Sequence, residues 1–197
     1  LGPDKTREAP GTTHLSIIDG YGNAVAMTAT VEFYFGSGRW AHGFLLNNEM
    51  TDFAREPSAD GKPVANAIVP GKRPRSSMSP TMVFDQDDEI VMVTGSPGGN
   101  SIPAYVSKSI VAVLDWGMSA QEAVDFPNIV ARGDKVRVEV AADPGPAFAS
   151  DLKDRGYTVE EREGENSGLH VIVVRPDRLD GAADKRREGI VRTMKAR

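Results

Sequence analysis

The fold is decided by residues 12–31, which read TTHLSIIDGYGNAVAMTATV. Two alternating runs flank the loop Gly20-Tyr21-Gly22, a pattern that predicts a β-hairpin. One face of this hairpin is apolar and consists of Leu15, Ile17, Val25, Met27, Ala29 and Val31. The opposite face has small alanines at positions 24 and 26 and is otherwise polar, with Thr12, His14, Ser16, Thr28, Thr30 and Glu32. We expect the apolar face to belong to the core.

A regular register centred on Tyr21 places Thr12 directly opposite Thr30. Opposed side chains have their β-carbons about 5 Å apart, so two hydroxyl groups would meet on the polar face. A neighbouring hydroxyl is able to orient and polarise a nucleophilic threonine, but such pairs also occur on ordinary strand surfaces. The pattern alone leaves both interpretations open.

Outward from the hairpin, we expect a loop at 36–43, a short buried strand at 44–46 and a long, lid-like loop at 54–75. Further strands are expected at 80–84, 90–94, 136–140, 157–162 and 169–175. Helices are expected at 101–115, from the capping box of Ser119 and Glu122 to just before Pro127, and at 147–155. The predicted class is α/β (α+β), with antiparallel hairpins, helices covering one side and no second domain.

Composition excludes several functional classes. The 197 residues carry a net charge of −5 without a basic stripe among aromatic residues, so we expect no nucleic-acid partner. Basic residues gather only at the C-terminus, which we expect to be a solvated end. The absence of cysteine excludes disulfides and thiolate chemistry. No apolar run suits a membrane helix, and the histidines lack metal-ligand spacing, so no membrane span, metal or cofactor is expected.

A glycine-rich segment, Gly95-Ser96-Pro97-Gly98-Gly99, lies between a predicted strand and a predicted helix. Backbone N–H groups at a helix start have no partner within the helix, and glycines allow a ligand to approach them closely. Such a turn suits a phosphate or a developing oxyanion, although it matches neither a Walker loop nor the dinucleotide fingerprint. A plain turn and an anion site both stay open.

Two further segments carry polar side chains. Residues 47–52 read NNEMTD and, together with Glu32, bring several carboxylates near the polar hairpin face. Carboxylates suit an ammonium ligand, paired catalytic acids or ordinary surface charge. Residues 73–80 read RPRSSMSP, a hydroxyl-rich turn that is able to hydrogen-bond a carboxylate.

Together these motifs resemble the small subunit of the γ-glutamyltransferase family. They are TTH at 12–14, GNAV at 22–25, LNNEMTDF at 46–53, RP at 73–74 with SSMSPT at 76–81, and TGSPGG at 94–99. Their order and spacing are family-like from Thr12 almost to the C-terminus. The resemblance implies an N-terminal-nucleophile hydrolase with an αββα sandwich, of which this chain supplies the small-subunit half.

The resemblance implies catalytic roles for four residues. Self-cleavage before Thr12 frees an α-amino group, which serves as the base for the Thr12 hydroxyl. This hydroxyl then forms a γ-glutamyl ester with glutathione or a related donor, and water or an amino-acid or peptide acceptor takes the γ-glutamyl group. Thr30 matches the threonine that hydrogen-bonds the nucleophile. Gly98 and Gly99 match the glycines that hold the oxyanion.

Binding roles also follow from the resemblance. Ser76 and Ser77 match the pair that holds the donor's α-carboxylate. The positions that bind its α-ammonium correspond to Glu32, Glu49 and Asp52. No metal or cofactor is implied.

The resemblance divides the chain at the cleavage site, with residues 1–11 as a precursor lead-in and residues 12–197 as the catalytic domain. While the Gly11–Thr12 bond is intact, the nitrogen of Thr12 is an amide and no base, so we expect an unprocessed form or a fragment. The expected partner is the large subunit of the same precursor. It supplies an arginine for the α-carboxylate and completes a second sheet, against which the polar hairpin face packs. A periplasmic or secreted location is implied.

Three alternatives stay open. A cephalosporin (glutaryl) acylase and a poly-γ-glutamate transferase share the scaffold. A glutaryl group lacks the α-ammonium that Glu32, Glu49 and Asp52 would neutralise, which favours a γ-glutamyl donor. An unprocessed relative that serves only as a binding subunit is disfavoured by the presence of Thr12, Thr30, Gly98 and Gly99.

Overall fold

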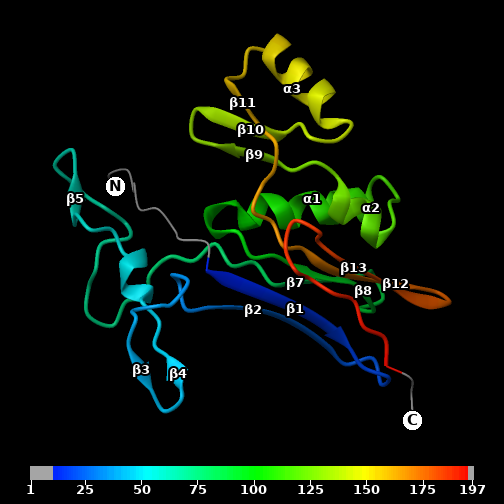
Figure 1. Ribbon diagram of the computed structural model, residues 1–197, viewed down its shortest axis with the longest axis horizontal. Helices are drawn as coiled ribbons and strands as arrows, with labels where there is room; N and C mark the ends of the chain where they lie inside the picture. The colour runs from blue at the N-terminus through cyan, green and yellow to red at the C-terminus, as the bar shows by residue number, and fades with distance from the viewer. Residues whose placement is uncertain (1–10, 195–197) are drawn as a thin grey trace.

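The structure, a computed structural model, describes residues 11–194. The expected lead-in at residues 1–10, and Lys195 and Arg197 of the basic C-terminus, lie outside this range. Figure 1 shows a layered body with a smaller unit of strands and a helix above it. Within the described range, no helix is both long enough and apolar enough to cross a membrane.

Four antiparallel strands form the central sheet in the order β13-β12-β8-β7. Their bounds are Thr81–Phe84 for β7, Ile90–Gly95 for β8, His170–Arg175 for β12 and Arg178–Ala183 for β13. Helices α1 (Ile102–Leu114) and α2 (Ala120–Asp125) cover one face of this sheet (Figure 1). The hairpin of β1 (Thr12–Ile18) and β2 (Ala24–Thr30) lies against the other face. The order of layers is therefore helix, sheet, hairpin.

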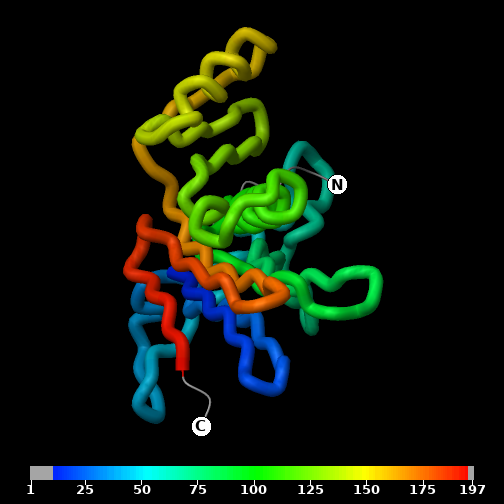
Figure 2. The backbone as a smooth tube through the Cα atoms, turned by 90° about the vertical axis from the view of Figure 1, so that its right-hand side faces the viewer, coloured from blue at the N-terminus to red at the C-terminus, as the bar shows by residue number. Residues whose placement is uncertain are grey.

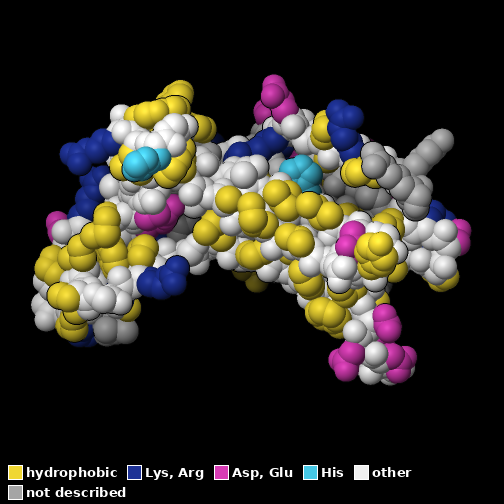
Figure 3. All heavy atoms as spheres, turned by 90° about the horizontal axis from the view of Figure 1, so that it is seen from below, with side chains coloured by type: hydrophobic (Ala, Val, Ile, Leu, Met, Phe, Trp, Pro, Cys, Tyr) yellow, Lys and Arg dark blue, Asp and Glu magenta, His cyan; other side chains and the backbone are white. Residues whose placement is uncertain are grey.

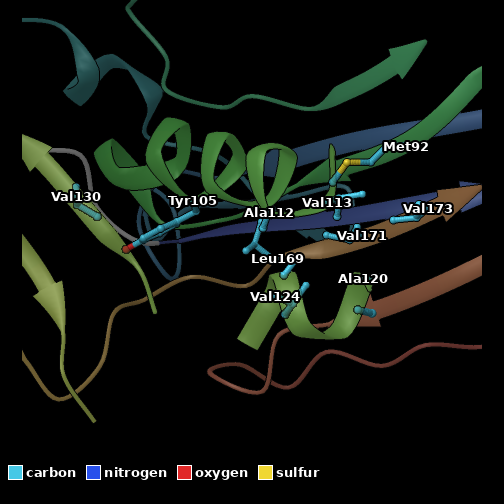
Figure 4. Close-up of a cluster of buried hydrophobic side chains, with 12 residues drawn as sticks. Met92, Tyr105, Ala112, Val113, Ala120, Val124, Val130, Leu169, Val171 and Val173 are labelled. Carbon is cyan, nitrogen blue, oxygen red and sulfur yellow. The ribbon is translucent and has the colours of Figure 1, made fainter. Parts of the chain in front are cut away.

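The main core lies between the central sheet and its two helices, as Figure 4 shows. Met92, Val171 and Val173 point from the sheet towards Tyr105 and Val113 of α1, and all five side chains are buried. Burial of each such side chain stabilises the fold by roughly 1.5–3 kcal/mol. The predicted capping box begins α2, where the Ser119 hydroxyl accepts a hydrogen bond from the backbone N–H of Glu122.

The smaller unit is a three-stranded sheet of β9 (Ile129–Arg132), β10 (Lys135–Glu139) and β11 (Val159–Arg162). Helix α3 (Gly145–Asp154) packs on it through Ala149, and the unit stands off the main body in Figure 2. β10 and β11 run parallel, a pairing that was not predicted, alongside the antiparallel pairs that were. The reason is that α3 connects the two strands as a crossover, which makes a parallel pair.

The hairpin has the predicted register, with Thr12 opposite Thr30. Its polar face packs on the central sheet: His14 is 3% exposed, and the Ser16 hydroxyl donates to the carbonyl of His170. The opposite face is exposed, with Ile17 at 51% and Met27 at 47%. Figure 3 views the molecule from below and shows hydrophobic side chains gathered across the middle of that surface. The prediction that the apolar face belongs to the core of this chain is wrong.

The buried face is polar because the gap above β8 is narrow. A β-carbon added to Gly95 would lie 2.1 Å from the His14 ring, so the imidazole packs directly on the backbone of β8 and a side chain at position 95 would displace it. The hydroxyls and imidazole in the gap hydrogen-bond one another, which removes the cost of burying them. The sheet that receives the polar face belongs to this chain itself.

The segment between the hairpin and the central sheet is mostly irregular. It contains two-residue strands and a 3₁₀ turn: β3 (Trp40–Ala41), β4 (Phe44–Leu45), η1 (Glu49–Asp52), β5 (Ser58–Ala59) and β6 (Lys62–Pro63). A second 3₁₀ turn, η2 (Gly99–Ser101), precedes α1. The expected buried strand at 44–46 is short and Phe44 is 58% exposed, so its predicted burial is wrong. Strands β9 and β13 were not predicted.

Candidate active site

Thr12 and Thr30 face each other at the open end of the hairpin. Thr12 is the first residue of β1 and is 8% exposed. The Thr30 hydroxyl accepts a hydrogen bond of 2.8 Å from the backbone N–H of Glu32. This contact fixes the Thr30 side chain beside its partner. Glu32 has a φ of 71°, and this left-handed turn ends the strand just after Thr30.

The carboxylates of Glu32, Glu49 and Asp52 lie together, with their oxygens all within 4.8 Å of one another. Glu32 and Asp52 are each 5% exposed. Asn48 brings the two segments together, because its side-chain oxygen accepts from the N–H of Phe33 at 2.9 Å and its own N–H donates to Val31. The acidic cluster therefore forms where the segment that follows β2 is held against η1.

The chemistry of the acidic cluster suits a cation. An ammonium group would find acceptors on several sides, and hard metal cations also prefer carboxylate oxygens. Whichever cation binds, carboxyl groups gathered this closely, two of them buried, favour its presence. The predicted role in binding an α-ammonium stays a prediction.

The glycine-rich segment forms the turn between β8 and α1. Gly98 has a φ of 135° and Gly99 a φ of 56°, which are backbone conformations that favour glycine. A β-carbon at Gly98 would lie 2.5 Å from the Tyr105 ring. The tight turn thus requires glycine for both reasons, and it leaves backbone N–H groups at the start of the helix.

Side chains behind this turn hold it in place. The Tyr105 hydroxyl donates to Glu165 at 2.5 Å, and the Arg137 guanidinium donates to both Glu165 and the Ser101 hydroxyl. Ser101 belongs to the turn itself. Burial, followed by the hydrogen bond to Glu165, raises the pKa of Tyr105, so the phenol stays protonated and acts as a donor. This network connects the turn to the smaller sheet through Arg137 of β10.

The hydroxyl-rich segment lies next to the glycine turn. The hydroxyl of Ser77 is 3.5 Å from the side-chain oxygen of Asn100, and Arg75 donates to the same oxygen at 3.0 Å. Asn100 follows Gly99 directly in the chain. The Ser76 hydroxyl accepts from the backbone N–H of Met78. Ser77 is therefore positioned beside the turn, and Ser76 is held within its own segment.

Arg187 connects the hairpin with the glycine turn. Its Nη1 donates to the carbonyl oxygen of Thr12 at 3.2 Å, and its Nη2 donates to the carbonyl of Asn166 at 3.1 Å. That Asn166 carbonyl would lie 3.2 Å from a β-carbon at Gly98. One guanidinium thus reaches both the strand of Thr12 and the surroundings of Gly98.

The prediction of a solvated C-terminal end is wrong for Arg186 and Arg187. Arg186 forms ion pairs with Glu139 at 2.6 Å and with Asp184 at 3.1 Å. Both arginines follow β13, a strand whose residues RLDGAA lack clear alternation and therefore give only a weak sequence signal. The one available hint is the charged run from Asp184 to Arg187, which directly follows that strand.

A second polar network lies beneath the hairpin. Ser16 uses its hydroxyl hydrogen on the carbonyl of His170, so its oxygen is available to accept from Nε2 of His14 at 3.1 Å. Nδ1 of His14 then accepts from the Thr28 hydroxyl at 2.8 Å. Burial, with a smaller contribution from neighbouring His170, lowers the pKa of His14 to about 4. His14 is therefore a neutral structural residue at physiological pH.

Comparisons with known proteins agree with this geometry. The chain matches the family model described as Gamma-glutamyltranspeptidase over residues 2–194. It is 39% identical over 189 residues to the glutathione hydrolase proenzyme of Escherichia coli (strain K12), covering 91% of this chain and 32% of that protein. The chain spans about a third of the length of the curated relatives that match most of it.

Solved structures give the same result. The gamma-glutamyltranspeptidase from Pseudomonas nitroreducens complexed with L-DON is similar with a TM-score of 0.80 and 35% identity, covering 93% of this chain and 100% of that chain. The cephalosporin acylase from Bacillus halodurans is similar with a TM-score of 0.78 and 26% identity, covering 93% of this chain and 34% of that chain.

Proposed function

Because this chain belongs to the gamma-glutamyltranspeptidase family, we propose that it is the catalytic small-subunit portion of a γ-glutamyl hydrolase or transferase. Its predicted N-terminal-nucleophile hydrolase fold is confirmed by the likeness to solved members. The observation that carries the proposal is the position of Thr12. It lies opposite Thr30, and Arg187 connects it to the surroundings of Gly98.

The proposed reaction begins with cleavage of the Gly11–Thr12 bond, which divides the chain into a lead-in at 1–11 and a catalytic domain at 12–197. The freed α-amine takes the proton of the Thr12 hydroxyl while its oxygen attacks the γ-carbonyl of the donor. Backbone N–H groups of Gly98 and Gly99 hold the resulting oxyanion. The C–N bond then breaks, and the departing amine receives the proton.

The second half of the reaction resolves the ester. Water or the amine of an amino acid or peptide loses a proton to the α-amine of Thr12 and attacks the ester carbonyl. The Thr12 oxygen departs and recovers its proton. The product is glutamate after hydrolysis or a γ-glutamyl compound after transfer. Thr30 orients the nucleophile in both steps.

Donor recognition is assigned to the polar groups around this centre. We propose that Glu32, Glu49 and Asp52 bind the α-ammonium of the donor, and that Ser76 and Ser77 bind its α-carboxylate. The mutual proximity of the three acids supports the first assignment. The position of Ser77 beside Asn100 supports the second. Glutathione carries both groups on its γ-glutamyl end and is the proposed donor.

The proposed partner is the large subunit of the same precursor. Its docking would cover the exposed apolar face of the hairpin, where Ile17, Val25 and Met27 are about half exposed. A face of this kind is unusual for a strand pair that faces only water. A periplasmic or secreted location is proposed from family membership.

A glutaryl acylase is the second candidate, since a cephalosporin acylase has the same fold. The acidic cluster favours a donor that carries an ammonium, which a glutaryl group lacks. Release of p-nitroaniline from γ-glutamyl and glutaryl p-nitroanilides compares the two directly. Faster glutaryl release would reverse the assignment. A poly-γ-glutamate transferase would be distinguished by activity on the polymer, and a pure binding subunit by the absence of any turnover.

The experiment that tests the proposal uses the full-length precursor. Intact mass and N-terminal sequencing are expected to find a chain that begins at Thr12, together with turnover of L-γ-glutamyl-p-nitroanilide. Thr12→Ala is expected to abolish both. The control is Thr158→Ala, at an exposed threonine before β11, which keeps both. Normal turnover by Thr12→Ala would exclude Thr12 as the nucleophile.

A further inference from the structure

Arg187 differs from its neighbour Arg186 in how its charge is balanced. Arg186 has two carboxylate partners, Glu139 and Asp184. Among residues 11–194, Arg187 has no ion pair, and its guanidinium donates instead to two backbone carbonyls, those of Thr12 and Asn166. Its Nε is buried and has no hydrogen-bond partner in the described part of the chain. A partly buried guanidinium without a carboxylate is costly to maintain, which points to a role for the charge itself.

The charge lies close to the proposed base. Nη1 of Arg187 is 3.2 Å from the carbonyl oxygen of Thr12. The nitrogen and carbonyl oxygen of one residue are only roughly 3–4 Å apart, so Nη1 of Arg187 lies no more than about 7 Å from the Thr12 nitrogen. Once the Gly11–Thr12 bond is cleaved, this nitrogen becomes an α-amine. A positive charge at that distance disfavours the protonated form of an amine.

We propose that Arg187 is a positioning residue that keeps the α-amine of Thr12 neutral near pH 7, so that it is ready to act as the base. This inference rests on the proposed function. An α-amine in a peptide has a pKa of about 7.7–8.0, so most of it would be protonated at neutral pH and unable to accept the proton of the Thr12 hydroxyl. The hydrogen bond to the Thr12 carbonyl holds the guanidinium where its field reaches the amine.

Other charged and titratable groups surround the same place. The carboxylates work against Arg187, burial lowers the pKa of both imidazoles, and burial raises the pKa of the Tyr105 phenol. The carboxylates are Glu32, Glu49, Asp52 and Asp184, the imidazoles are His14 and His170, and the phenols are Tyr34 and Tyr105. The acids would raise the pKa of the amine, which makes the opposing charge of Arg187 necessary. Donor binding neutralises part of the acidic cluster.

The test is the pH dependence of kcat/KM for L-γ-glutamyl-p-nitroanilide with the mature enzyme. Arg187→Gln keeps an N–H donor but removes the charge, and Arg187→Lys keeps the charge. We expect the acid limb of the Gln variant to move up by about 1 pH unit or more. The loss relative to wild type is therefore about 10-fold larger at pH 6 than at pH 9. The Lys variant is expected to keep the wild-type acid limb.

A structural role alone would lower kcat/KM by the same factor at every pH, and that result would overturn the inference. Arg178→Gln is the control, since this exposed arginine at the start of β13 is paired with Asp177. If a variant does not self-cleave, separate expression of the large subunit and of a small subunit that begins at Thr12 supplies the mature form. If Arg187→Gln does not fold, the pH profile of the wild-type enzyme decides. An acid limb with an apparent pKa at or above about 8 refutes the inference. An inactive wild type would instead refute the proposed function.

Discussion

Replacing His14 with glutamine should remove most of the acid sensitivity of the fold between pH 7.5 and pH 5. The imidazole is 3% exposed and makes hydrogen bonds to Thr28 and Ser16. Its pKa is lowered from 6.5 to about 4 in the folded state, by burial first and then by His170. The unfolded chain therefore binds more protons below pH 6.5, so stability is complete above that pH and is lost as the pH falls towards 4.

The magnitude follows from the two pKa values. A single group that titrates at 6.5 when unfolded and at about 4 when folded costs about 2 kcal/mol at pH 5 and about 3 kcal/mol at pH 4. The pKa of His170 is also lowered by burial, so its contribution has the same sign. Carboxylates contribute mainly below pH 5, which leaves the interval from pH 7.5 to pH 5 to the histidines.

Urea unfolding of the full protein at four pH values in this interval measures the effect. His14→Gln is expected to lower the free energy of unfolding at pH 7.5 by about 1–2 kcal/mol, because two hydrogen bonds are disturbed, but to flatten its decline towards pH 5. His42→Asn is the control, since this exposed histidine lies in a left-handed turn that asparagine tolerates. Parallel declines for wild type and His14→Gln would refute the reasoning.

Two further substitutions test the geometry of the site. Gly95→Ala places a β-carbon within 2.1–2.6 Å of the His14 ring, and we expect urea unfolding to show that the free energy of unfolding falls by about 1–3 kcal/mol. Gly164→Ala is the control, because a β-carbon there would meet nothing within 4 Å. An equal effect of the two substitutions would exclude the close approach of His14 to Gly95. Asp52→Asn is expected to raise the donor KM about 10- to 100-fold with little change in kcat, because a charge-assisted contact is lost. Steady-state kinetics with Asp87→Asn as the exposed control measure this, and an unchanged KM would remove Asp52 from the ammonium site.

The local features of the chain were predictable from its sequence. The Gly20-Tyr21-Gly22 loop fixes the register that sets Thr12 opposite Thr30, because the side-chain period of a strand is two. The capping box at Ser119 and the glycine turn before α1 were also predictable, since both depend on neighbouring residues alone. The gathering of Glu32 with the acids of residues 47–52 was predicted from the sequence, whereas their role in binding an ammonium followed only from the resemblance. The structure brings the three acids together through Asn48.

Features that depend on contacts between distant segments were not predictable. β13 has a weak pattern because its glycine and aspartate interrupt the alternation, yet it pairs along its full length with β12. The position of Arg187 depends on that strand, since it follows directly and returns to Thr12, 175 residues earlier in the chain. The parallel pair of β10 and β11 depends on the crossover through α3.

A single cause explains both the burial of the polar face of the hairpin and the exposure of its apolar face. Thr12, the proposed nucleophile at the first residue of β1, is 8% exposed and lies on the inner face, between the hairpin and the central sheet. Alternation then puts His14 and Ser16 on the same inner face, and their hydrogen bonds make that face tolerable in a narrow gap. The same alternation forces Ile17 and Met27 outward. Placing Thr12 on the inner face therefore leaves an apolar surface that residues 11–194 do not cover, and this is the surface to which the proposed large subunit would bind.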